Sequence, residues 1–159
     1  MDTQLAVVSR VYAGGQTGVD RAALDAAIRA SVVHGGWCPA GGWAEDKPYA
    51  PGVLVTYPGL KPTIEADPAV RTRLNIRDSH ATIALGVTVE SPGCSLALDY
   101  AHATGRPVLV NPSTPEDAHA WLAGIGRELI LNVVGPRASE SPGVYDGARK
   151  FMDALLTLV

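Results

Sequence analysis

The stretch Val11–Asp25, VYAGGQTGVDRAALD, places an apolar segment, a glycine-rich turn and the start of a helix in immediate succession. The apolar residues from 5 to 12 predict a strand that is buried on both faces. A helix over 18–31 carries small side chains on much of its surface, which would let it approach a sheet closely. This strand–turn–helix order is typical of a parallel α/β unit.

The remaining chain continues the alternation of strands and helices. This rhythm predicts one domain over residues 1–159, an α/β fold with an open, mostly parallel sheet and helices on both faces. The further helices are expected over 67–78, 96–104, 114–125 and 143–158, and the further strands over 81–85, 107–110 and 129–134.

The segment 35–62 does not fit this rhythm, because it is rich in proline and glycine and lacks clear periodicity. It also holds four aromatic residues, and disordered segments are poor in aromatics. A long ordered connection of this kind is usually functional, so we predict a loop that covers a ligand. The alternative is that Trp37 and Trp43 only fill a small core beneath the loop.

Composition excludes several classes of protein. The chain has 159 residues, of which 47% are apolar and 18% charged, as in globular proteins. A net charge of -3 argues against a general nucleic-acid binder. No apolar run is long enough to span a bilayer and no signal segment is visible, so we expect a cytoplasmic protein. Cys38 and Cys94 do not form a CxxC pair and the four histidines lack zinc-type spacing, so we expect free thiols and no metal site.

Ligands of parallel sheets bind beyond the carboxyl ends of the strands, where loops lead into helices. The turn Gly14–Gly18 has this position, and its glycines would let backbone N–H groups approach an anion. A purely steric turn is the alternative. Thr17 would be a donor. Asp20 would face the pocket, about 140° from a helical stripe of Arg21, Asp25 and Arg29 that we expect to be exposed.

Two further turns share this position. In the first, Gly93 and Cys94 precede Ser95 at a helix start, where Ser95 could also act as a cap and Cys94 could have a lowered pKa. In the second, Arg137 could clamp a phosphate or carboxylate and Ser139 could donate a hydrogen bond. The alternative is an exposed Arg137 and a turn-capping Ser139. Together the turns predict a shared phosphate site.

One polar segment precedes the middle strand. Asp78 could accept hydrogen bonds from a ligand, or it could cap its helix or pair with Arg77. Arg71 and Arg73 are predicted to lie on a solvated helix face.

Four motifs together resemble the molybdenum cofactor carrier protein family. They are GGQTGVDRAALDAA at 14–27, HGGWCPAGGWAEDKP at 34–48, RxRxNIRDS at 71–79 and LNVVGPRASESPGVY at 131–145, and the resemblance runs from about residue 11 to 156. That family is similar to a larger Rossmann-like group that includes the lysine-decarboxylase-like phosphoribohydrolases.

The resemblance implies a Rossmann-like fold and a homo-oligomer, with dimer or tetramer left open. It implies that the chain binds molybdenum cofactor (molybdopterin) without changing it chemically and passes it to molybdoenzymes. In this family a flat pterin would be stacked by Trp37, Trp43 or Tyr49 and bonded through its polar edge to a carboxylate or amide. The implied phosphate-binding residues are Gly14, Gly15, Gln16, Thr17, Gly18, Gly93, Cys94 and Ser95, with Asp20, Asn75, Asp78, Arg137 and Ser139 lining the same pocket.

Two departures from the related patterns are visible. His80 replaces the final acid of the family's RDSD motif. The sequence PGCSLALD at 92–99 replaces the PGGxGTxxE of the phosphoribohydrolases and lacks the matching glutamate. We therefore expect a carrier rather than an enzyme. The alternative is a protein that processes or senses a nucleotide or nucleoside monophosphate, in which replacement of Asp20, Asp78 or Asp99 would abolish activity.

Overall fold

The computed structural model describes residues 4–88 and 92–159. None of the helices in these two ranges combines the length and apolarity that crossing a membrane requires. The strands are β1 (Val8–Tyr12), β2 (Val33–Cys38), β3 (Leu60–Pro62), β4 (Ala81–Ala84), β5 (Val108–Val110) and β6 (Leu129–Val134). The helices are α1 (Val19–Arg29), α2 (Pro68–Arg77), α3 (Pro92–Ala103), α4 (Pro115–Ile125) and α5 (Val144–Thr157), with short 3-10 turns η1 (Ala40–Gly42) and η2 (Gly52–Leu54).

The strands form one six-stranded sheet in the order β3-β2-β1-β6-β4-β5, and every pairing between them is parallel. The last strand, β6, therefore lies in the middle of the sheet between β1 and β4. The two ends of the described chain also meet, because Arg127 donates from Nη1 to the carbonyl oxygens of Leu5 and Val159, each at 2.8 Å. The predicted α/β fold with a parallel sheet is confirmed.

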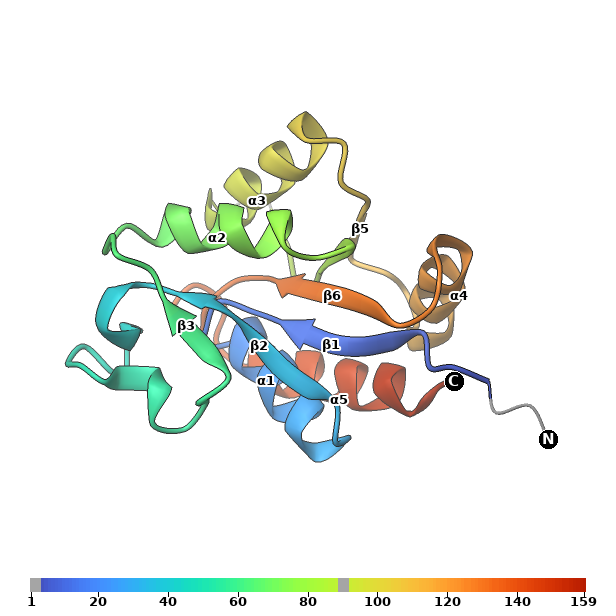
Figure 1. Ribbon diagram of the computed structural model, residues 1–159, viewed down its shortest axis with the longest axis horizontal. Coiled ribbons are helices and arrows are strands. Elements are labelled where there is room, and N and C mark those ends of the chain that lie inside the picture. The colour runs from blue at the N-terminus through green and yellow to red at the C-terminus, as the bar shows by residue number, and fades with distance from the viewer. Residues whose placement is uncertain (1–3, 89–91) are drawn as a thin grey trace.

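Helices cover both faces of the sheet, as predicted (Figure 1). The larger core lies on the face of α1, α4 and α5, where Val11, Leu131 and Val133 point from the central strands. The smaller core lies under α2 and α3, where Ile76 and Ala97 pack on Ala84 and Val134 of the strands. The small buried alanines of α1 bring this helix close to the sheet and to α5.

The prediction of an uninterrupted loop over 35–62 is wrong at both ends. Most of β2 and all of β3 lie within it, and they pair in register from Gly36 opposite Leu60 to Cys38 opposite Pro62. Strand β2 escapes prediction because it contains Gly35 and Gly36 where alternating apolar side chains would mark a strand. A Cβ atom on Gly36 would lie 2.7 Å from the Asn75 Oδ1 atom, so the glycine permits α2 to pack closely on this strand.

The remaining segment, 39–59, packs against α1. Val53 and Tyr57 are buried in the larger core, and the Tyr57 hydroxyl donates to Asp25 at 2.6 Å. The guanidinium of Arg21 forms two hydrogen bonds to the Asp46 carboxylate, at 2.9 and 2.6 Å. The stripe that begins with Arg21 and Asp25 is therefore covered by this segment, and the expectation that it is exposed is wrong for these two residues.

Candidate functional site

A cavity of about 180 Å³ lies where the sheet predicts a ligand, beyond the carboxyl ends of β1 and β6. Its walls come from the β1–α1 turn, the first half of α2, the start of α3 and the β6–α5 loop. Small-molecule pockets usually measure about 300–1,000 Å³, so this cavity would enclose only one end of a larger ligand. The lining residues are Gln16, Asp20, Pro68, Ala69, Arg71, Thr72, Cys94, Leu96, Ala97, Val134, Gly135, Arg137 and Glu140.

Arg71 is the central cation of this cavity. Its side chain is only 15% exposed, and one of its Nη1 hydrogens is donated to the Thr72 hydroxyl at 2.9 Å. Its Nε atom is buried and has no hydrogen-bond partner among the described residues. The expectation of a solvated Arg71 is therefore wrong, whereas Arg73 is exposed as predicted. The difference arises because α2 turns the Arg71 side toward the sheet.

Gly14 lies directly beneath this guanidinium. A Cβ atom at Gly14 would come within 2.6 Å of Arg71 Nη1 and within 2.7 Å of its Cζ and Nε atoms. The turn thus needs a glycine here so that an arginine can lie flat against the backbone.

Asp20 is the buried acid of the cavity, with a side chain that is 5% exposed. Its carboxylate accepts a hydrogen bond from the Gln16 backbone N–H at 3.2 Å and lies 4.0 Å from Arg71 Nη1. Burial raises the pKa of Asp20, and the positive charge of Arg71 opposes this shift. The structure therefore places the predicted Asp20 on the cavity side of α1.

The predicted α3 turn contributes one residue to the cavity lining. Cys94 is 3% exposed, and burial raises the pKa of its thiol to about 12. The helix start could have lowered this pKa, but burial outweighs it and the thiol stays protonated at neutral pH. Gly93 lies in the first turn of α3 and Ser95 follows it with an exposed side chain.

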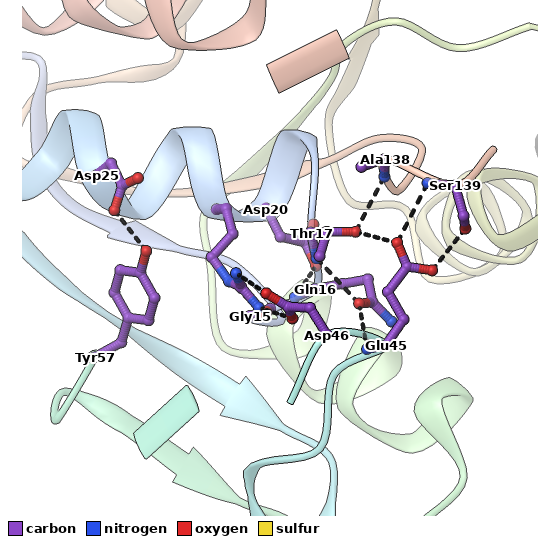
Figure 2. A network of polar contacts seen from close by, with 11 residues as sticks. Gly15, Gln16, Thr17, Asp20, Asp25, Glu45, Asp46, Tyr57, Ala138 and Ser139 are labelled. Carbon is purple, nitrogen blue, oxygen red and sulfur yellow. Dashed lines mark hydrogen bonds and ion pairs between the residues drawn. The ribbon is translucent and has the colours of Figure 1, made fainter. Parts of the chain in front are cut away.

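Thr17 and Ser139 meet beside the cavity and surround the carboxylate of Glu45, a residue that was not predicted to belong to the site (Figure 2). Glu45, from segment 39–59, accepts hydrogen bonds from the Thr17 hydroxyl, from the Ser139 N–H at 3.2 Å and from the Ser139 hydroxyl at 2.6 Å. Its Oε2 atom lies 3.7 Å from Arg137 Nε. Burial raises the pKa of Glu45, but the hydrogen bonds from Ser139 and Thr17 outweigh this, and the net pKa is lowered.

Gln16 and Gly18 hold these loops together. The Gln16 Oε1 atom accepts the backbone N–H groups of Thr17 and Glu45, each at 3.0 Å. Gly18 has φ 79° and ψ −126°, which few other residues adopt, and a Cβ atom there would lie 2.5 Å from the Pro136 carbonyl oxygen. Gly18 therefore allows the β1–α1 turn to contact the β6–α5 loop.

Gly15 faces away from the cavity. Its φ is 84°, and a Cβ atom would meet Leu60 at 3.1 Å and Val53 at 3.2 Å. Replacing Gly15 would thus disturb the packing of segment 39–59, so binding is better tested at Arg71.

The structure does not bring Trp37, Asn75 and Asp78 to the lining of this cavity. Asn75 is 2% exposed and brackets the Trp37 backbone, accepting its N–H at 2.7 Å and donating to its carbonyl oxygen at 3.0 Å. The Trp37 indole donates to Asp78 at 2.9 Å, and Arg77 donates to Asp78 at 2.7 and 3.1 Å. Hydrogen bonding from Arg77 and then from Trp37 lowers the pKa of Asp78. Trp37 and Asp78 instead line a second hollow of about 170 Å³, together with Arg10, Tyr12 and Lys61.

Asn75 should be a strong determinant of stability. Asn75→Asp keeps an acceptor for the Trp37 N–H but removes the donor for its carbonyl oxygen, and it buries a charge. We expect the free energy of unfolding to fall by about 2–4 kcal/mol, since a buried unpaired polar group costs about 1–3 kcal/mol and a charged one costs more. Urea denaturation of Asn75→Asp beside the exposed control Arg73→Gln measures this effect. Equal stability of the two variants would show that the two hydrogen bonds between Asn75 and the Trp37 backbone contribute little.

The remaining candidates lie elsewhere in the fold. Trp43 is half-buried in segment 39–59, Tyr49 is 84% exposed, and no residue of this segment is among those that line the cavity. Within residues 4–88 and 92–159, no three His, Cys, Asp or Glu side chains are grouped so that they could hold a metal ion. Sequence reasoning missed Arg71 and Glu45. The contact between Arg71 and Gly14 produces no local pattern in the sequence, because the two residues are far apart in the chain. Glu45 could have been found, since it lies within the motif at 34–48.

Comparisons with known proteins show the family and support the fold. Residues 11–156 match the family model described as "Circularly permutated YpsA SLOG family". The chain is also similar to a crystal structure called a putative molybdenum carrier protein from Syntrophus aciditrophicus SB. The two share 31% identity and a TM-score of 0.82, over 96% of this chain and 98% of that one. No curated protein matches.

Proposed function

Because the chain belongs to the circularly permutated YpsA SLOG family, we propose that it binds a phosphate-bearing small molecule in the cavity beside Arg71. The buried Arg71 Nε atom carries this proposal. A buried N–H group without an acceptor is costly, and a phosphate oxygen would supply the missing acceptor together with a charge of the right sign. The start of α3, which borders the cavity, would add the partial positive charge of a helix N-terminus.

We further propose that this ligand is molybdenum cofactor, which the protein carries and protects without chemical change. The similarity to a structure called a putative molybdenum carrier protein supports this identity. The cavity encloses only part of such a ligand, so its remainder would extend beyond the cavity. In this proposal a homo-oligomer in the cytoplasm delivers the cofactor to molybdoenzymes.

Anaerobic purification from cells that make the cofactor tests this proposal. We expect close to one pterin per chain, measured as the fluorescent oxidised pterin after denaturation, with molybdenum in the same fractions. A matched purification from cells that cannot make the cofactor is the control. A preparation free of pterin in both hosts would contradict the carrier function.

A second candidate function is the processing of a nucleoside monophosphate, and one observation favours it. Asp20 is a buried acid with a raised pKa beside a cavity, which is typical of a general acid or base. The two functions differ in the effect of Asp20→Asn. An enzyme would lose turnover and keep its binding, whereas a carrier would show no turnover of nucleotides with either residue.

A further inference from the structure

The carboxylate of Glu45 occupies a donor cluster, which we define as the Thr17 hydroxyl, the Ser139 N–H and hydroxyl, and the Arg137 guanidinium. These donors come from two separate loops, β1–α1 and β6–α5. The acceptor comes from a third segment, 39–59 (Figure 2). Three hydrogen bonds and one cation thus converge on two oxygen atoms.

Contacts that do not involve Glu45 already orient the donors of this cluster. The Thr17 oxygen already accepts the backbone N–H of Ala138 at 3.0 Å, which leaves its own proton to point toward the carboxylate. The backbone direction at Ser139 is fixed by the turn, in which Glu140 and Ser141 donate to the Arg137 carbonyl oxygen at 3.0 Å. Such a preformed set suits any oxyanion of similar size, including a phosphate.

The cluster adjoins the cavity. Arg137 lines the cavity and also lies within 3.7 Å of Glu45. Gln16 lines the cavity and accepts the Glu45 backbone N–H. The cluster therefore shares Arg137 with the cavity lining, and a second lining residue, Gln16, is bonded to Glu45.

Two features of the surroundings would let an external anion replace Glu45. Its side chain is 23% exposed, so water can reach it, and Arg137 has a second acidic partner, Glu140, at 2.9 Å. The neighbouring Asp46 stays attached to Arg21 through its own two hydrogen bonds. Release of Glu45 would therefore free the cluster while Asp46 keeps segment 39–59 on α1.

We infer that the donor cluster is a second oxyanion subsite, which Glu45 fills in the free protein and vacates when a phosphate group enters. This inference rests on the proposed function, because the subsite would extend the same ligand site. When an internal carboxylate fills a site in most molecules, the apparent affinity for an external anion equals the intrinsic affinity multiplied by the fraction of molecules in which the site is open. Glu45 thus determines the concentration at which an external anion occupies the subsite.

Titration calorimetry with inorganic phosphate tests this inference on the full chain, in buffer free of other oxyanions. We expect Glu45→Ala and Glu45→Gln to bind phosphate at least about tenfold more tightly than the unchanged protein at this subsite, which corresponds to an internal contact formed in nine of ten molecules. Asp46→Asn is the matched control, since it weakens the attachment of the same segment without touching the cluster. In Glu45→Ala/Ser139→Ala the added affinity should disappear, because the subsite loses a donor.

Equal phosphate affinity of Glu45→Ala, Glu45→Gln and Asp46→Asn would overturn the inference, as would a gain that survives Ser139→Ala. Melting temperatures without phosphate confirm that each variant is folded. The failure of the proposed function looks different. If the Glu45 variants gain phosphate affinity but the protein never carries pterin, the inference of a second subsite stands. Only the proposal that the ligand is molybdenum cofactor then fails.

Discussion

Arg71→Met is expected to lower the affinity for the cofactor by at least about 100-fold. The methionine fills much of the same volume but cannot donate from the Nε position, which is buried and without a partner in the described structure. Removing one member of a buried charge pair costs about 2–5 kcal/mol, and about 2.7 kcal/mol corresponds to 100-fold in affinity. Anaerobic fluorescence titration with purified molybdopterin measures the change.

Arg73→Met is the matched control, because Arg73 lies on the same helix with an exposed side chain. Its affinity should equal that of the unchanged protein. Arg71→Met also removes the first cation that opposes the raised pKa of Asp20, so Arg71→Met/Asp20→Asn provides a second variant without an unpaired acid. Tight binding by a folded Arg71→Met would exclude Arg71 as the anchor of the ligand.

The largest effect on stability is expected from Gly18→Ala. The added Cβ atom would lie 2.5 Å from the Pro136 carbonyl oxygen and 3.0 Å from the Ala138 nitrogen, and the residue has φ 79°. Backbone strain of this kind costs about 1–3 kcal/mol, and overpacking adds about 1–3 kcal/mol. We expect a loss of about 3 kcal/mol or more, which for a chain of this size lowers the melting temperature by about 6–12 °C.

Gly147→Ala is expected to have the opposite effect, a gain in stability. Gly147 lies in α5, is exposed, and has no atom within 4 Å of an added Cβ. Alanine should stabilise this helix by up to about 1 kcal/mol. Calorimetric melting curves of the two variants test the account. A melting temperature for Gly18→Ala close to that of the unchanged protein would show that the two loops can separate at little cost.

The alternation of strands and helices in the sequence was sufficient to predict the α/β fold, and the starts of α2 and α4 carry clear sequence signals. Thr114 before Pro115 illustrates this, since its hydroxyl accepts the Asp117 N–H and caps α4 as its position suggests. The order of the strands could not be predicted in the same way. Only the parallel pairing of β6 with both β1 and β4 places the last strand in the centre.

Residues of the candidate site could be predicted where the sequence shows that a strand ends and a loop leads into a helix. Gln16, Asp20, Cys94 and Arg137 follow or face such ends, and the structure places all four on the cavity. Asn75 was assigned to the pocket from a motif, yet its polar atoms are used to fasten α2 to β2. A sequence motif preserves the residue types of a region without saying which of them remain available to a ligand.

A crystal structure of the protein isolated anaerobically with its ligand tests the central claim most directly. We predict that the phosphate lies in the cavity with an oxygen atom within hydrogen-bond distance of Arg71 Nε. A ligand bound instead in the hollow lined by Trp37 and Asp78, with the Arg71 cavity empty, would contradict it.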